Sequence, residues 1–176
     1  KGGKAVGFCG IDGSFITCKK QYTRVDGKDV DLGYVGDIVE VNPHLIKYIS
    51  DDAYIPVIAP IGTDENGQSY NINADSVAAS IAAATSAEKL ILLTDVEGVK
   101  DENGDVVFET GREEIHNMIH SGVINSGMIP KVLGCLKAID AGVKGVHIID
   151  GRIPHCLLLE IFTKTGIGTL IKGSDY

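Results

Sequence analysis

The period of apolar and polar positions changes repeatedly along the chain, and each change predicts a new element. Short apolar runs and alternating stretches predict strands at residues 5–9, 14–20, 32–41, 54–61, 69–75, 89–96, 145–150 and 168–171. Apolar residues at helical spacing predict helices at residues 42–50, 77–84, 112–120, 130–141 and 155–163. Because strands and helices alternate, we predict an α/β fold. It would be a three-layer αβα sandwich with a mainly parallel central sheet, built as a single domain over residues 1–176.

The strands should take different places in that sheet. Residues 89–96 form the clearest buried parallel strand, and residues 54–61 are apolar enough for the middle of a sheet. Pro56 is better tolerated at a strand start or an edge. Residues 21–29 are polar and predict the turn region of a hairpin.

The most informative stretch joins a predicted strand to a helix of small residues. If residues 69–75 form a strand, its period of two places Asn71, Asn73 and Asp75 on one face. Two carboxamides and a carboxylate beside a helix N-terminus suit recognition of a polar anion and of the charged groups that process it. The simpler alternative is a turn in which Asp75 caps the helix, but it explains the two asparagines less well.

Lys131 is the second informative position. Pro130 marks the start of a helix, so Lys131 lies in its first turn, where its charge opposes the helix dipole at a cost of about 0.3–1 kcal/mol. A bound anion would reverse the sign of that interaction, and Gly127 leaves the preceding backbone open to close approach. The residues therefore allow a phosphate site, with a solvated lysine as the alternative.

Composition and charge exclude several classes of function. The 176 residues are 44% apolar and 23% charged, as in ordinary globular proteins, and no apolar run approaches the roughly 20 residues that span a bilayer. A net charge of −8 with scattered Lys and Arg argues against a nucleic-acid surface. We expect a cytoplasmic protein that binds neither nucleic acid nor membranes. The cysteines lack metal-ligand spacing, which predicts reduced thiols at Cys9, Cys18, Cys135 and Cys156.

The first residues predict neither a dinucleotide loop nor a leader. Gly7, Gly10 and Gly13 have the spacing G-x-x-G-x-x-G and are followed by β-like residues, which disfavours a dehydrogenase. The chain begins at Lys1 with no Met and no signal-peptide pattern, and a predicted strand starts at Ala5. We therefore expect that this sequence starts partway along a longer protein.

Several stretches together resemble the acetylglutamate kinases of the amino-acid kinase family. The resemblance covers almost the whole chain and corresponds to the C-terminal part of such an enzyme, with the N-terminal portion missing. The matching stretches are residues 2–7, 31–36, 55–62, 70–75, 90–98, 127–132 and 147–152.

This resemblance implies transfer of a phosphoryl group from ATP to the γ-carboxylate of N-acetyl-L-glutamate in arginine biosynthesis, with Mg²⁺ held mainly through the nucleotide phosphates. The residue matching Lys131 stabilises the moving phosphoryl group in that family. The one matching Asp75 holds the catalytic lysines, and those matching Asn71 and Asn73 contact N-acetylglutamate. Residue chemistry agrees, because phosphoryl transfer needs positioning and charge compensation more than covalent chemistry.

The resemblance also implies a pocket for ATP or ADP and a limit on what these residues do alone. A second catalytic lysine, glycine-rich loops and a substrate-binding arginine belong to the family's N-terminal part and are not in this sequence. We therefore expect this chain alone to bind nucleotide weakly at best and not to turn over. The implied nucleotide-binding residues are Thr94, Asp95, Val96, Glu97, Gly98, Val99, Val123, Ile124, Asn125, Gly127 and Met128.

The C-terminal stretch from His155 to Thr169 resembles that of arginine-inhibited, hexameric members of the family. This implies arginine binding around Glu160 and Gly166 and a homo-oligomer, dimeric or hexameric, in the full-length enzyme. The residues alone allow an alternative, in which Leu157 to Leu159 and Phe162 are core residues and Glu160 is a solvated carboxylate.

Two other functions stay open. A related kinase of the same fold, acting on carbamate, aspartate, glutamate or UMP, is disfavoured by residues 71–75 together with residues 127–131. The alternative from another class is a non-catalytic regulatory module that senses arginine or docks a signalling protein of the PII type. Arginine binding without any nucleotide effect would support that module.

Overall fold

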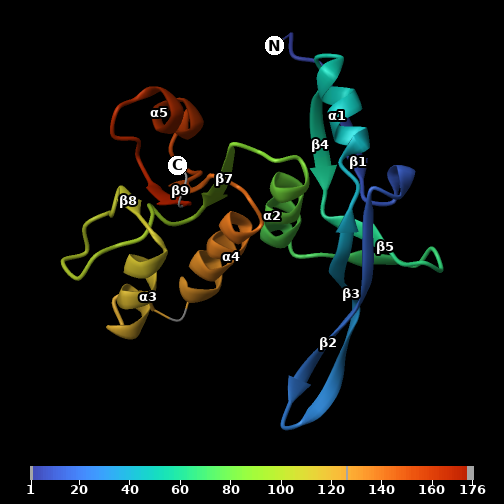
Figure 1. Cartoon of the computed structure of the whole chain (residues 1–176), viewed down its shortest axis with the longest axis horizontal. Helices are drawn as coiled ribbons and strands as arrows, with labels where there is room; N and C mark the ends of the chain where they lie inside the picture. Colours follow the sequence, from blue (N-terminus) through green and yellow to red (C-terminus); the bar gives the residue numbers. More distant parts are fainter. Residues whose placement is uncertain (1, 126, 174–176) are drawn as a thin grey trace. The chain divides into compact units, whose positions relative to one another are not determined.

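The computed structural model describes residues 2–125 and 127–173. The chain divides into two compact units, Lys1–Thr85 and Ser86–Tyr176, and each is described by itself. In Figure 1 the first unit runs from blue to green and the second from green to red. The prediction of a single domain stays a prediction. Lys1, at which we expect the sequence to start partway along a longer protein, lies outside the described residues.

A two-stranded parallel sheet joins the beginning of the first unit to its middle. β1 (Ala5–Cys9) pairs in parallel with β4 (Ile55–Ala59), and α1 (His44–Asp51) contacts β4. Ile55 and Val57 are 58% and 55% exposed. Among the described residues β1 is the one strand beside β4, so the prediction that residues 54–61 lie in the middle of a sheet is wrong for this part of the chain.

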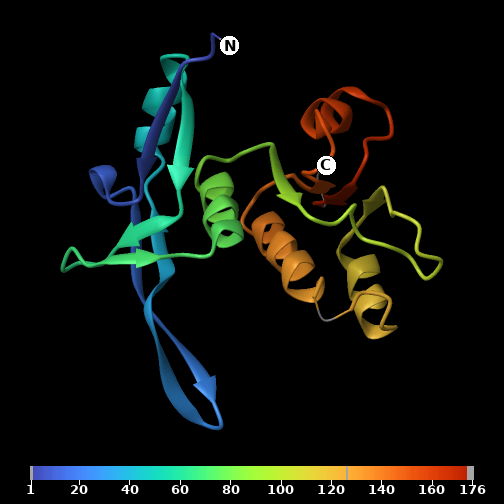
Figure 2. The ribbon, with the colours of Figure 1, turned by 180° about the vertical axis from the view of Figure 1, so that it is seen from behind.

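Four strands of the first unit close into a small barrel in the order β2-β3-β6-β5. They are β2 (Ile16–Val25), β3 (Lys28–Val41), β5 (Ile61–Thr63) and β6 (Ser69–Asn71), and a 3-10 turn at Asp12–Ser14 precedes β2. The β2–β3 hairpin continues past the barrel, and the polar residues 21–29 form its far end (Figures 1 and 2). The core of this unit contains Phe15, Ile16, Cys18, Ile46, Tyr70, Ile72 and Val77.

The strand-to-helix corner after β6 differs from the prediction. The strand ends at Asn71, and α2 (Ala74–Ala84) begins three residues later. Asn73 is the N-cap, because its side-chain oxygen accepts a hydrogen bond from the Ser76 amide at 3.0 Å. Asp75 instead lies in the first turn of the helix. The predicted strand to residue 75 and the alternative with Asp75 as cap are therefore both wrong, since an asparagine two residues earlier satisfies the helix start.

The second unit contains a four-stranded sheet in the order β7-β9-β10-β8. β9 pairs in parallel with β7 and antiparallel with β10, and β10 pairs in parallel with β8. Every residue of β9 is buried, as expected for a strand with neighbours on both sides and helices on both faces. The strands are β7 (Lys89–Thr94), β8 (Glu109–Thr110), β9 (Gly145–Asp150) and β10 (Thr169–Lys172).

Helices lie on both faces of this sheet. α4 (Ile129–Asp140) contacts β9 and β10 and packs beside α3 (Arg112–His120), while α5 (Cys156–Phe162) contacts β9 from the opposite face (Figures 1 and 2). The sequence prediction of an α/β fold with parallel strands is confirmed. Buried side chains from both faces include Val132, Cys135 and Leu136 of α4 and Cys156 of α5.

All four cysteines are free thiols; three are buried and Cys9 is half-buried. None of the helices in the described ranges combines the length and the apolar character that crossing a bilayer requires.

Candidate functional site

The second unit holds a cavity of about 370 Å³ beside the carboxyl end of β7. Three segments form its wall: the loop after β7, the loop between α3 and α4, and the start of α4. All but one of its lining residues, Lys100, belong to the set predicted from the sequence. The lining residues are Asp95, Val96, Gly98, Val99, Lys100, Val123, Ile124, Asn125, Gly127, Met128 and Lys131.

Two predicted residues, Thr94 and Glu97, lie beside this cavity rather than in its wall. The Thr94 hydroxyl accepts a hydrogen bond from the Val96 amide at 3.1 Å, and the Thr94 carbonyl accepts one from the Gly151 amide at 2.8 Å. Glu97 forms a 2.7 Å ion pair with Lys100. Both residues therefore shape the loop, and Lys100 is a cavity residue that the sequence analysis missed.

The loop after β7 is held by a buried contact with β10. The Val99 amide donates a 2.8 Å hydrogen bond to the Thr169 hydroxyl oxygen, and neither residue is exposed to solvent. Gly98 has φ +154, and a Cβ on it would lie 2.6 Å from the same hydroxyl oxygen. The wall can approach β10 this closely because residue 98 is glycine.

A tight turn continues that loop. The Asp101 carboxylate accepts hydrogen bonds from the amides of Asp105 and Asn103 at 2.9 and 2.8 Å, and Lys100 forms a β-bridge with Val106. The Asp105 amide and, next, the Asn103 amide hold the pKa of Asp101 below its ordinary value, against the opposing effect of burial. Lys100 thus projects from a backbone that is fixed on both sides.

The start of α4 supplies the basic end of the cavity. The amides of Met128 and Ile129 both donate to the Asn125 carbonyl oxygen at 3.1 Å, which closes the turn before the helix. The side chain of the N-cap residue, Met128, makes no capping hydrogen bond, and Lys131 is the third residue of the helix. The positive end of the helix dipole and a lysine therefore face the same cavity, which favours an anionic group there.

The chemistry of the wall fits a ligand with an apolar part and an anionic part. Five lining side chains are apolar, and the charged ones are Asp95, Lys100 and Lys131. A cavity of this size, mostly apolar with a few converging polar groups, is typical of small-ligand sites. A nucleotide has this combination, since its base is flat and its phosphates carry the charge.

The described residues also bear on how Mg²⁺ would be held. They contain no group of three or more His, Cys, Asp or Glu side chains arranged to hold a metal ion. Mg²⁺ normally keeps several waters and binds through one or two carboxylates plus substrate phosphates. Asp95 is the carboxylate of this cavity, so these residues fit an ion held together with the phosphates and not one held by protein side chains alone.

The first unit contains three predicted site residues, Asn71, Asn73 and Asp75. Asn71 ends β6, Asn73 caps α2 and Asp75 lies in the first helical turn, and all three are exposed while Ile72 between them is buried. The structure thus gathers them at one helix start. Lys131 belongs to the second unit.

Glu160 in α5 is buried, and the alternative of a solvated carboxylate is wrong. One of its oxygens lies 2.6 Å from His147 Nδ1, and the other accepts hydrogen bonds from the Ile167 and Gly168 amides at 2.7 and 3.2 Å. Burial raises the pKa of Glu160, but the Ile167 amide, His147 and Gly168 together outweigh it and hold the pKa below its ordinary value. Gly166, with φ +64, fits because a Cβ there would lie 2.6 Å from Glu160 Oε2.

The other half of that alternative, an apolar core around α5, is also wrong. Leu157, Leu158, Leu159 and Phe162 are 41%, 55%, 37% and 78% exposed. The inward positions of this short helix are taken by Cys156 and Glu160 instead. His147 was not predicted to have a role, although a histidine between the apolar residues of a buried strand is a signal that it has a buried partner.

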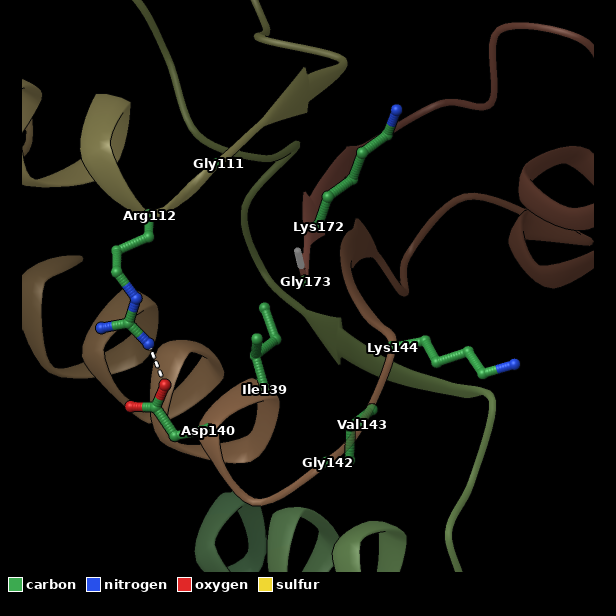
Figure 3. A pocket seen from close by; sticks show the side chains of 9 residues that line it. All are labelled: Gly111, Arg112, Ile139, Asp140, Gly142, Val143, Lys144, Lys172 and Gly173. Carbon is green, nitrogen blue, oxygen red and sulfur yellow. Dashed lines mark hydrogen bonds and ion pairs between the residues drawn. The ribbon is translucent and has the colours of Figure 1, made fainter. Parts of the chain in front are cut away.

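A second cavity, of about 500 Å³, lies at the other end of this sheet, around the C-terminus of α4 (Figure 3). Arg112 on α3 forms an ion pair with Asp140 on α4, and Lys172 pairs with Glu109 at 2.5 Å. In Figure 3 the ammonium groups of Lys144 and Lys172 point away from the Ile139 side of the cavity. These two pairs lie at the surface, and the charged groups that line the cavity do not converge on a common point.

Comparison with known proteins adds independent findings. The model of the "Amino acid kinase family" matches residues 1–150. The acetylglutamate kinase of Caldicellulosiruptor saccharolyticus is 57% identical over 173 residues, which cover 97% of this chain and 59% of that protein. The chain thus spans about three-fifths of the length of the curated relatives it matches.

Among solved structures, N-acetylglutamate synthase from Neisseria gonorrhoeae is similar in two complexes. The complex with coenzyme A and N-acetyl-glutamate has a TM-score of 0.87 at 26% identity and covers 99% of this chain and 39% of that one. The complex with coenzyme A and L-arginine has a TM-score of 0.84 at 27% identity and covers 97% and 38%.

Proposed function

The chain belongs to the amino acid kinase family, and we propose that it is the nucleotide-binding part of an acetylglutamate kinase. Such an enzyme transfers the γ-phosphoryl group of ATP to the γ-carboxylate of N-acetyl-L-glutamate. The observation that carries the proposal is the cavity of the second unit, where a lysine at a helix start faces apolar walls. The 57% identity to an acetylglutamate kinase supports this substrate over those of other family members.

In this proposal the apolar part of the cavity takes the adenine base, and the start of α4 takes the phosphates. Val96 and Met128 offer apolar surface, and the start of α4 offers the positive end of a helix dipole with Lys131 in its first turn. Mg²⁺ would neutralise phosphate charge and orient the γ-phosphoryl group when it is bound with ATP.

The chain's own residues contribute charge and position. Lys131 compensates the charge on the oxygens of the transferring phosphoryl group. Asn71 and Asn73 bind N-acetyl-L-glutamate, and Asp75 holds the catalytic lysines in place. All three residues lie at the start of α2 and are exposed, which supports contact with a bound substrate.

We further propose that these 176 residues bind nucleotide weakly and do not turn over by themselves. The chain spans 59% of the Caldicellulosiruptor enzyme, so the catalytic groups expected from the rest of such an enzyme are not among these residues. Loss of one electrostatic partner in a charged transition state costs about 10²–10³ in rate.

A two-part experiment tests the proposal. First, Mg-ADP binding is measured by calorimetry on the 176-residue chain and on its Lys131→Ala and Asp95→Ala variants. Second, these residues replace the matching part of the Caldicellulosiruptor enzyme, and the chimera is assayed with N-acetyl-L-glutamate, carbamate, aspartate, glutamate and UMP as acceptors. Activity on N-acetyl-L-glutamate alone is the expected result. A folded chimera that phosphorylates another acceptor instead would refute the substrate, and a folded chain and chimera that bind no ADP would refute the nucleotide site.

A second candidate function is arginine sensing around Glu160 and Gly166. It is favoured by the fold similarity to an N-acetylglutamate synthase solved with L-arginine, and by the irregular segment that the Glu160 carboxylate holds. Arginine binding by a chain that does not bind Mg-ADP would favour this regulatory module, as would docking of a PII-type protein. Inhibition of the chimera by arginine would place regulation and catalysis in one protein, and its sedimentation would show whether a dimer or hexamer forms.

A further inference from the structure

The start of β10 connects two features that lie apart in the sequence. The amides of Ile167 and Gly168 donate to the Glu160 carboxylate at 2.7 and 3.2 Å. The hydroxyl oxygen of the next residue, Thr169, accepts the hydrogen bond from Val99 in the cavity wall at 2.8 Å. Three consecutive residues thus join a buried carboxylate to the cavity.

These contacts lie on opposite faces of the sheet. Thr169 is paired with Ile148, and Leu170 is paired with His147, whose ring contacts Glu160 from α5. Successive side chains of a strand point to opposite faces. The side chain of Thr169 therefore points to the face away from α5, where it meets Val99.

Close packing leaves this connection little freedom. Thr169 and Val99 are fully buried, so water cannot replace the hydrogen bond between them. A Cβ on Gly168 would lie 2.2 Å from the Ile148 carbonyl oxygen, and one on Gly98 would lie 2.6 Å from the Thr169 hydroxyl oxygen. A shift of the backbone at residues 167–168 must therefore move Thr169, and with it the wall at Val99.

We propose that Thr169 is a positioning residue. It transmits a change in the hydrogen bonds of the Glu160 carboxylate across the sheet to the cavity wall at Val99. The consequence for nucleotide affinity rests on the proposed function, whereas the coupling between Glu160 and Val99 does not. Linkage makes the coupling reciprocal, so a ligand that orders Val99 also protects the amides of Ile167 and Gly168.

The direct test uses three variants of matched chemistry in the 176-residue chain. Thr169→Val keeps the shape and removes the acceptor, and Thr169→Ser restores the hydroxyl. Thr110→Val is the control, because Thr110 is equally buried on the neighbouring strand and its hydroxyl donates to Glu114 at 2.9 Å, away from the cavity. Amide hydrogen exchange at Val99 should be about tenfold faster in Thr169→Val and near normal in the other two.

The second test starts at the far end of the connection. Glu160→Ala should speed exchange at Val99 as well as at Ile167 and Gly168, while the amides inside α3 keep their protection and report that the unit is folded. It should also weaken Mg-ADP binding severalfold, as Thr169→Val does. Normal exchange at Val99 in Glu160→Ala, with fast exchange at 167 and 168, would overturn the coupling, and so would Thr169→Ser behaving like Thr169→Val.

The two hypotheses fail in different ways. If the unmodified chain binds no Mg-ADP but Val99 still responds to Glu160→Ala, the nucleotide function fails and the coupling stands. If Mg-ADP binds with equal affinity to the unmodified chain and to a Thr169→Val variant whose Val99 amide is unprotected, the coupling has no bearing on the ligand, and the proposed role of Thr169 is overturned.

Discussion

The two cavities of the second unit are similar in size but differ in how their walls are held. The wall of the first is fixed by contacts without solvent access, such as the hydrogen bond from Val99 to Thr169. The second is bordered by exposed pairs, of which Arg112 with Asp140 is typical, with side chains 47% and 60% exposed. Binding sites need groups held in place before the ligand arrives, so the wall of the first cavity is better suited to a binding site than that of the second.

The largest expected effect comes from the lysine of the first cavity. Lys131→Ala should lower kcat of the chimera by about 10²–10³-fold, because in the proposed reaction the lost charge faces the transferring phosphoryl group. Steady-state kinetics with ATP and N-acetyl-L-glutamate measure this change. Lys137→Ala, in the last turn of the same helix, is the matched control and should leave kcat unchanged. Equal losses in both variants would show that Lys131 acts through helix stability alone.

A pair of glycine substitutions extends the comparison to backbone packing. Gly98→Ala places a methyl group 2.6 Å from the Thr169 hydroxyl oxygen, and overpacking of this kind costs about 1–3 kcal/mol. Gly111 lines the second cavity and has open space around its Cβ position, so Gly111→Ala should change the free energy of unfolding by less than about 1 kcal/mol. Urea unfolding of both variants measures the difference. Similar values for the two would mean that the wall at Gly98 yields easily.

The comparison also shows what the sequence could predict. Most residues of the first cavity were expected from the family resemblance, and local pattern marked only a few of them: the open backbone at Gly127 and a lysine in the first turn of the helix that Pro130 begins. Thr169 could not be found this way, since its partner Val99 is 70 positions distant and a threonine in a strand is ordinary. Lys100 was missed for a similar reason, because its place in the cavity depends on the turn formed at Asp101.

The first unit also shows which features the sequence could predict and which it could not. The sequence predicts that residues 69–84 contain a strand and a helix, and β6 and α2 are there. The alternation of polar residues suggested a strand through Asp75, but Asn73 caps the helix, and the choice between two capping side chains is decided by the local backbone. The apolar strand at 54–61 was placed in the middle of a sheet because composition reports what a strand is suited for, not which neighbours it has.

Buried and exposed carboxylates should respond differently to pH. The folded-state pKa of Glu160 lies below its unfolded value, so its contribution to stability is complete above the unfolded pKa, about 4.3, and is lost as the pH falls through the folded pKa. The free energy of unfolding of the unmodified chain should therefore drop more steeply below about pH 4.3 than that of Glu160→Gln. Glu109→Gln, which alters an exposed pair at the second cavity, should retain the steep drop. Parallel pH profiles for the unmodified chain and Glu160→Gln would contradict the role given to its hydrogen bonds.

The smallest effect is expected at the second cavity itself. Arg112→Ala removes the ion pair with Asp140, but exposed pairs contribute only about 0–1 kcal/mol, because water solvates both partners well when they separate. The affinity for Mg-ADP should not change, since Arg112 pairs with Asp140 at the surface and the charges of this cavity do not converge. Calorimetry with Mg-ADP and urea unfolding of Arg112→Ala, beside Lys131→Ala, measure both quantities. If Arg112→Ala weakened Mg-ADP binding as much as Lys131→Ala, the distinction between a preorganised cavity and a surface hollow would not hold for this protein.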